Sequence, residues 1–202
     1  MKWYEYILIV ATAIWIYRRL RGEKADEWRM TQEEREAIGR EGALELLKHL
    51  SLTSPDDAGV RFELGYALCG AGRHGEALEA FGHAGRLDPA LNVSAGRGRA
   101  LLGLGRVAEA LAELERAVAA EPKNVGAHAD LGSALQRRGR HEEALESVDR
   151  AISIDPDDAG LHTRRGQILK SLGRSAESSA ALERAAKAGS ATAGPARPWG
   201  AG

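Results

Sequence analysis

The sequence predicts an all-α protein in which a single transmembrane helix precedes an α-solenoid of stacked helix–turn–helix units. The stretch GRHGEALEAFGHAGRLDP at residues 72–89 returns as GRHEEALESVDRAISIDP at residues 139–156. Four windows of this kind begin 33, 34 and 34 residues apart, at Arg61, Ser94, His128 and His162. Periods of this size are typical of stacked arrays of one supersecondary unit. The run ILIVATAIWI near the start is apolar on every side of a helix, which predicts the membrane segment.

The composition fits a folded protein without a strongly charged surface. Of the 202 residues, 44% are hydrophobic and 28% are charged, and the formal net charge is -1. This balance argues against disorder and against nucleic-acid binding driven by bulk positive charge. Cys69 is the only cysteine of the sequence, so the chain cannot form an internal disulfide and no oxidising compartment is implied.

Residues 1–21 have the pattern of a membrane anchor. Aromatic residues flank the apolar run at both ends, as in segments that touch both membrane interfaces. The stretch from Trp3 to Tyr17 spans about 22 Å as a helix. Snorkelling basic side chains at both ends and extension of the helix by Leu20 can close most of the gap to a ~30 Å hydrocarbon core. Basic residues gather behind the run, between residues 18 and 24, so the positive-inside rule predicts a single-pass protein with a cytoplasmic repeat domain.

Two other interpretations of this segment remain open. A cleaved signal peptide needs a small-residue cleavage site after the apolar run, but the candidate Ala11-Thr12-Ala13 lies inside it. Cleavage would make the protein a periplasmic or secreted one. The third interpretation is a buried core helix.

The rest of the chain divides into segments by spacing and composition. Thr31 and Glu34 form a capping box that starts a short helix, and Gly39-Arg40 echoes the Gly-Arg turn of the repeats. These features indicate a degenerate unit at the N-terminal end of the stack. The expected segments are a linker at 22–30, a degenerate helical repeat at 31–57, full repeats at 58–90, 91–124 and 125–158, a divergent fourth repeat at 159–188, and a disordered tail at 189–202.

The residues that recur in each unit have mechanical reasons to be there. A glycine stands in the middle of each first helix, where it costs about 1 kcal/mol relative to alanine, so we expect a close helix crossing at that point. Alanines on the second helix are expected to supply the small partner surface. A second glycine ends the first helix in the left-handed conformation, and a proline ends the second helix of three units. The mid-helix glycines are Gly65, Gly98, Gly132 and Gly166, and the turn glycines are Gly72, Gly105, Gly139 and Gly173.

This pattern resembles the tetratricopeptide repeat (TPR). The family pattern corresponds in the first full repeat to Leu64-Gly65, Leu68, Ala77, Phe81, Ala84 and Pro89. The resemblance covers about residues 58–188 and implies a right-handed solenoid. The fourth repeat departs from the pattern at Ser178-Ser179 and at Ser190, which stands in place of the proline. The known carboxylate clamp for chaperone C-termini does not transfer, because Phe62 and Tyr66 occupy the places of its lysine and asparagine.

The resemblance implies a concave groove, lined by the first helices, that binds an extended peptide or a helix. When the family's groove positions are carried over to this sequence, aromatic side chains fall at the membrane-proximal end of the groove. Basic and amide-bearing side chains fall at the far end. This order suggests a partner with an apolar anchor and an acidic stretch. The alternative is that its basic side chains are ordinary solvated charges. The candidate groove residues are Phe62, Tyr66, Cys69, Arg99, Leu102, Ser133, Gln136, Arg137, Gln167 and Lys170.

No pattern of residues predicts catalysis, a metal site or a cofactor. The GRGRALLG stretch at 96–103 lies inside a repeat helix and has no preceding strand, unlike a phosphate-binding loop. His128 and His162 share one repeat position and His74 and His141 share another, so the repeat spacing explains these histidines without a metal site. No base is arranged beside Cys69 that could activate it as a nucleophile. We therefore expect a non-enzymatic, membrane-anchored scaffold without cofactors or nucleic-acid partners. The alternatives are a self-associating assembly subunit, which would form homo-oligomers, and a regulatory subunit of a separate enzyme.

Overall fold

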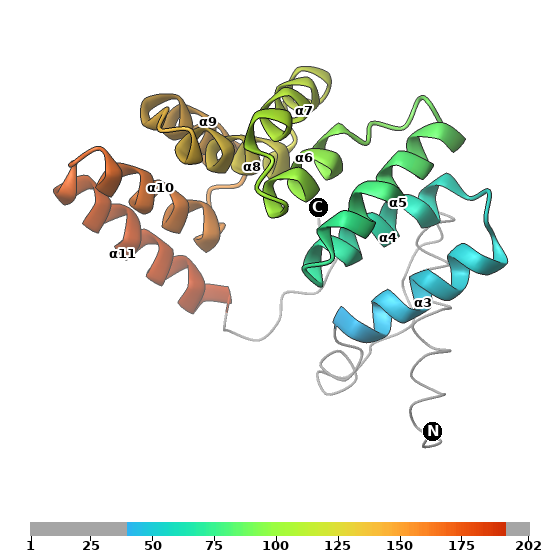
Figure 1. The fold of residues 1–202 in the computed structure, drawn as a ribbon. Coiled ribbons are helices and arrows are strands. Elements are labelled where there is room, and N and C mark those ends of the chain that lie inside the picture. Colours follow the sequence, from blue (N-terminus) through green and yellow to red (C-terminus); the bar gives the residue numbers. More distant parts are fainter. Residues whose placement is uncertain (1–39, 193–202) are drawn as a thin grey trace. The chain divides into compact units, whose positions relative to one another are not determined.

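The computed structural model describes residues 40–192, with side chains described for residues 42–189. This part of the chain forms nine α-helices and no strand (Figure 1). The all-α class expected from the sequence is therefore confirmed over the described residues. The helices fall into two compact units that join between Leu104 and Gly105.

The expected anchor at 1–21, the linker at 22–30 and the first helix of the degenerate repeat lie outside the described residues. Within residues 40–192, no helix combines the length and the apolar character needed to cross a bilayer.

The first unit contains four of the described helices: α3 (Arg40–Thr53), α4 (Ala58–Gly70), α5 (His74–Leu87) and α6 (Ser94–Gly103). Helix α4 pairs with α5, while α3 packs on α4 and α6 contacts both α4 and α5. Their apolar faces enclose a core in which Leu47, Leu64, Leu68 and Phe81 are buried. A repeat is thus completed by the helix that follows it, as expected for stacked units.

The second unit contains five of the described helices: α7 (Val107–Ala120), α8 (Val125–Arg137), α9 (His141–Ile154), α10 (Ala159–Ser171) and α11 (Ser175–Thr192). Helix α8 pairs with α9 and α10 pairs with α11 (Figure 1). Helix α7 packs on α8, and α9 packs on α10. Leu114, Val148, Ile168 and Leu169 are among its fully buried side chains.

Each first helix of a repeat is separated from its second helix by a Gly-Arg turn. The four turn glycines have φ angles of 74, 75, 75 and 73°. This is the left-handed region that glycine adopts without strain, so the sequence prediction for these positions is confirmed. The arginine after each glycine forms a two-bonded ion pair with the glutamate three residues later. The Nε–Oε1 distances are 2.6 Å for Arg73–Glu76, 2.7 Å for Arg106–Glu109, 2.6 Å for Arg140–Glu143 and 2.7 Å for Arg174–Glu177.

The mid-helix glycines are required by large side chains from the second helices. A Cβ atom at Gly65 would lie 2.7 Å from the Phe81 ring, and one at Gly132 would lie 2.6 Å from a methyl group of Val148. At Gly166 the nearest atoms belong to Leu182, at 2.9 Å. The expected close crossing is therefore present, but its main partner is not the alanine that the sequence suggested. A bulky residue one turn further along fills the space that the glycine leaves.

Helix α11 is longer than the other second helices, with 18 residues against 14 in α5, α7 and α9. It continues past residue 188, where the sequence suggested that the fourth repeat ends, and reaches Thr192. The stretch after residue 188 contains no proline before Pro195, and Ser and Ala are compatible with a helix. Residues 193–202 lie outside the described part.

Candidate functional site

The candidate residues of the first unit include two aromatic rings on α4. Phe62 and Tyr66 are one helical turn apart, and their ring centroids are 5.1 Å apart with an interplanar angle of 80°. Both rings also meet Phe81 of α5 edge to face, at centroid distances of 5.8 and 5.1 Å. Phe81 is fully buried, whereas Phe62 and Tyr66 are half-buried. The buried ring therefore fixes the two outer rings from below, and edge-to-face geometry adds to the stability of the group.

Helix α6 brings a basic side chain to this aromatic group. The Arg99 guanidinium carbon lies 5.5 Å from the centroid of the Tyr66 ring, which is a cation–π distance. Arg99 and Cys69 are half-buried, but Leu102 is only 7% exposed. The structure thus brings Phe62, Tyr66 and Arg99 together, while Leu102 belongs to the packing of α6.

The candidate residues of the second unit lie on α8 and α10, which contact one another. Ser133 and Gln136 are half-buried, whereas Arg137, Gln167 and Lys170 are exposed. Their side chains are basic or carry amide and hydroxyl groups, so they can donate several hydrogen bonds to a carboxylate. This surface is polar where that of the first unit is aromatic.

A polar contact links the two helices of this surface, and the sequence did not indicate it. Arg164 of α10 donates a hydrogen bond to the Ser133 hydroxyl of α8, and that hydroxyl donates to the Ala129 carbonyl oxygen over 3.0 Å. Arg164 lies one turn before Gln167 on the same helix, and this spacing is the signal that could have placed it on the same surface. A further ion pair joins consecutive repeats, because Arg165 Nε lies 2.7 Å from Asp149 Oδ1 of α9.

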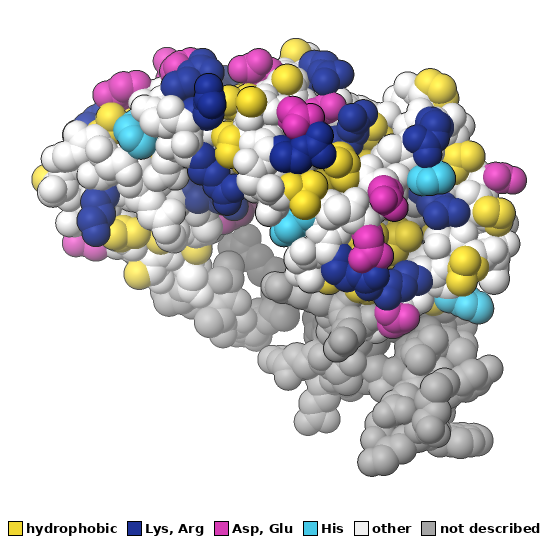
Figure 2. Space-filling view, in the orientation of Figure 1, with side chains coloured by type: hydrophobic (Ala, Val, Ile, Leu, Met, Phe, Trp, Pro, Cys, Tyr) yellow, Lys and Arg dark blue, Asp and Glu magenta, His cyan; other side chains and the backbone are white. Residues whose placement is uncertain are grey.

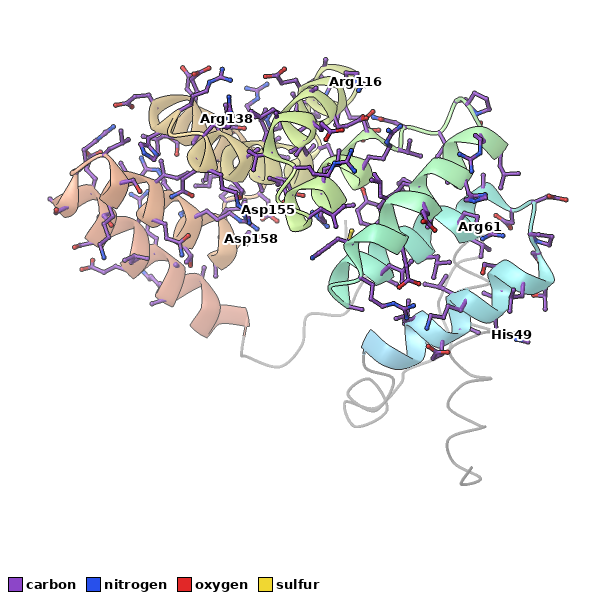
Figure 3. All side chains as sticks on the ribbon, in the orientation of Figure 1. His49, Arg61, Arg116, Arg138, Asp155 and Asp158 are labelled. Carbon is purple, nitrogen blue, oxygen red and sulfur yellow. The ribbon has the colours of Figure 1, made fainter. Side chains whose placement is uncertain are left out.

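Hydrogen bonds of side chains stabilise the turns that precede the first helices of the third and fourth repeats. Asp158, labelled in Figure 3, accepts hydrogen bonds from the amides of Gly160 and Leu161 and caps α10. The imidazole Nε2 of His162 lies 2.8 Å from the Pro156 carbonyl oxygen, and His128 makes the same contact with Pro122 at 3.0 Å. These two histidines, which share a repeat position, thus have the same structural partner in two repeats.

The charged groups with shifted pKa values lie in the Gly-Arg turns and not on the candidate surfaces. Hydrogen bonds from Arg140 hold the pKa of the Glu143 carboxyl below its usual value, and the same bonds raise the pKa of Arg140. The other three Arg–Glu pairs show the same directions. All of these groups are solvent-exposed, so the shifts reflect local pairing. Among the described residues, no group of three His, Cys, Asp or Glu side chains is placed to hold a metal ion.

Comparisons with protein-family models identify the repeat unit. One tetratricopeptide repeat model matches residues 96–159 and a second matches residues 159–188. Residues 96–188 therefore contain tetratricopeptide repeats. The matched stretch begins within α6 and covers α7 to α10 and most of α11, so the TPR arrangement extends over the polar surface described above. No curated protein matches the sequence.

Solved structures with a similar fold include those of MamA and YrrB. A crystal structure of MamA is 21% identical, covers 82% of this chain and 99% of its own, and has a TM-score of 0.61. MamA 41-end from Desulfovibrio magneticus RS-1 is 24% identical over 79% of this chain and 91% of its own, with a TM-score of 0.62. YrrB, described as a TPR protein with an unusual peptide-binding site, is 21% identical over 76% of this chain and 79% of its own, with a TM-score of 0.55. At these identities the likeness shows a shared fold.

Proposed function

We propose that this protein is a membrane-anchored TPR scaffold that binds a segment of a partner protein on the first-helix surfaces of its repeats. The observation that carries the proposal is the aromatic group of the first unit, where Phe62 and Tyr66 remain half-buried beside the Arg99 guanidinium. Half-exposed aromatic rings with an adjacent arginine are the residue types that dominate protein-binding surfaces. The peptide-binding site ascribed to YrrB, which has the same fold, supports the class of activity.

The partner segment would carry an apolar anchor and an acidic stretch. The anchor would rest on the Phe62 and Tyr66 rings, with a carboxylate close to Arg99. Within the second unit, Arg137 and Lys170 would offer acidic side chains a separate basic surface. Basic and acidic side chains are interspersed on the face shown in Figure 2, so bulk attraction would contribute little, and recognition would depend on these local groups.

The membrane part of the proposal rests on the sequence pattern of residues 1–21. An anchor at that position would hold the repeats at a bilayer surface, on the cytoplasmic side, and would raise the local concentration of the scaffold near membrane-bound partners. Retention of the chain in the membrane pellet after carbonate extraction, and its loss on deletion of residues 1–21, would be the expected result. Release of the intact chain into the carbonate supernatant would contradict anchoring.

The binding proposal can be tested with synthetic peptides and the full-length chain in mild detergent. The probes are fluorescein-labelled peptides with one leucine or tryptophan and an increasing number of aspartates, measured by fluorescence polarisation. Replacing Arg99→Glu together with Arg137→Glu should weaken binding of the acidic peptides by roughly tenfold or more, because each change replaces attraction with repulsion. Tyr66→Ala should weaken every peptide that carries the anchor.

A matched control is provided by Arg150 and Arg184, which are exposed on the second helices α9 and α11. Changing both to glutamate alters the net charge by the same amount away from the first helices. An equal loss of binding in both double variants would show bulk electrostatics rather than a site. Failure of every anchored acidic peptide to bind the unmodified chain would refute the partner chemistry.

A further inference from the structure

Helix α6 differs from the first helices of the other repeats. It has 10 residues, whereas α4, α8 and α10 each have 13. In those three helices an N-cap side chain accepts a hydrogen bond from a backbone amide of the first turn; the N-cap residues are Asp57, Asn124 and Asp158. The N-cap residue of α6 is Val93, and no side chain caps the helix there. Helix α6 therefore lacks its first turn and the interaction that stabilises such a turn.

The cause is a one-residue deletion in the loop before α6. In the other three repeats the capping residue stands eight positions before the mid-helix glycine. In the second repeat Ala90 stands eight positions before Gly98, and alanine has no acceptor. The loop is closed instead by Asp88, which accepts from the Ala90 amide over 2.9 Å, and by Asn92, which accepts from the Ser94 amide over 3.2 Å. The helix can begin only after these local turns.

The rest of α6 is also weak as a helix. Three of its ten residues are glycine, against three of thirteen in α4 and two of thirteen in α8 and in α10. Two of these glycines are fixed by packing, because a Cβ atom would lie 2.4 Å from the Phe81 ring at Gly96 and 2.3 Å from the His74 ring at Gly103. Its two large buried apolar side chains, Leu101 and Leu102, are as many as α8 has in Leu131 and Leu135, so packing does not compensate for the missing turn. Short length, glycine content and a missing N-cap are features of segments that open locally.

We infer that α6 opens locally more readily than the other first helices and that this opening controls the aromatic–arginine surface of the first unit. Arg99 lies over Tyr66 only while α6 is folded against α4, so opening removes the basic side chain from the aromatic group. A partner that bridges Tyr66 and Arg99 would bind the closed form and shift the population towards it. The opening itself follows from the helix alone, whereas its role in binding rests on the proposed function.

Hydrogen exchange of the full-length chain, read by mass spectrometry or NMR, tests the opening without any ligand. The amides of Arg99, Ala100 and Leu101 are compared with those of their counterparts in α8, Ser133, Ala134 and Leu135. We expect protection in α6 to be at least about tenfold lower, which corresponds to about 1.4 kcal/mol in opening free energy. The counterparts in α4, from Tyr66 to Leu68, control for opening of the whole first unit.

A repair variant tests the cause. Replacing Ala90-Leu91 by Lys-Asn-Leu restores the missing residue and places an asparagine eight positions before Gly98, as Asn124 stands before Gly132. We expect exchange in α6 to slow towards that of α8. The reciprocal variant, deletion of Lys123 with Asn124→Ala, should speed exchange at the start of α8.

Three results would overturn the inference. They are equal protection of α6 and its counterparts in α4 and α8, unchanged exchange in the repair variant, and unchanged exchange of α8 in the reciprocal variant. None of them depends on a partner. If the repair variant slows exchange but the anchored acidic peptides bind neither chain, the opening stands and the proposed function fails. If those peptides bind both chains with the same affinity and association rate, the opening stands but does not control the surface.

Discussion

Replacing Gly65 by alanine should destabilise the first unit, although alanine is the better helix former. The added methyl group would lie 2.7 Å from two carbons of the Phe81 ring and 2.8 Å from a third. Contacts that short require the ring to move. Phe81 is fully buried, and a Cβ atom at Gly96 on the neighbouring helix would lie 2.4 Å from the same ring, so the ring is confined on that side too.

Two opposing terms decide the magnitude. Alanine in place of glycine in a helix interior gains about 1 kcal/mol. Overpacking a well-filled core costs about 1–3 kcal/mol. Because the rings of Phe62 and Tyr66 also pack edge to face on Phe81, its movement would disturb them as well, and we expect a net loss of about 1–2 kcal/mol.

Urea unfolding of the full-length chain in mild detergent, followed by circular dichroism, measures this loss. Gly42→Ala in α3 is the control, since a Cβ atom there meets nothing within 4 Å and should leave stability unchanged or raise it by up to about 1 kcal/mol. Combining Gly65→Ala with Phe81→Leu should cost less than the sum of the two single changes, because the smaller side chain makes room for the methyl group. If Gly65→Ala raised the unfolding midpoint as Gly42→Ala does, the argument that the ring requires this glycine would be wrong.

Three further predictions concern the framework of the repeats. Gly139→Ala should lower the free energy of unfolding by about 1–2 kcal/mol in the same urea assay, because the φ angle of 75° is strained for alanine. Glu143→Gln should destabilise the chain near neutral pH, and the difference should shrink as the pH falls below 4.5, because a carboxyl whose pKa is lowered from 4.5 in the folded state loses its stabilising effect as it is protonated. A pH-independent difference in a pH series of unfolding midpoints would contradict this. A double-mutant cycle on Arg165→Ala and Asp149→Ala should give a coupling of about 0.2–1 kcal/mol that shrinks in high salt, since the pair is partly exposed at 24% and 45%.

The framework of the repeats could be predicted because local rules determine it. A glycine followed by arginine between two apolar helical patterns requires a left-handed turn, and the structure has one at each of the four positions. Asp158 precedes α10 and caps it, as an aspartate at the start of a helix commonly does. These features depend on residues a few positions apart, so one sequence contains all the information that they need.

The candidate surface was harder to predict because exposure depends on neighbours that are distant in the sequence. Leu102 occupies the same repeat position as Lys170, yet Leu102 is buried and Lys170 is exposed. The contact of Arg164 with Ser133 joins residues 31 positions apart and depends on how α8 and α10 face one another. The sequence suggested an alanine as the partner of the mid-helix glycine, because small residues at a helix crossing suggest small partners. In the structure the partner lies one turn later on the second helix, and at Gly65 it is Phe81 that fills the space.

Framework and surface therefore use different positions of the same repeat. The position after the mid-helix glycine is Tyr66, Arg99, Ser133 and Gln167 in the four repeats, while the glycine before it is the same in all four. The glycine has to remain small because a side chain of the second helix lies against it, as at Gly65, Gly132 and Gly166. The residue after it is half-buried or exposed in all four repeats, and its side chain differs in each of them. In the first repeat this residue also takes part in packing, because the Tyr66 ring meets Phe81. A repeat can therefore vary its surface beside a glycine that must stay small, most freely where the surface side chain is exposed, as at Gln167.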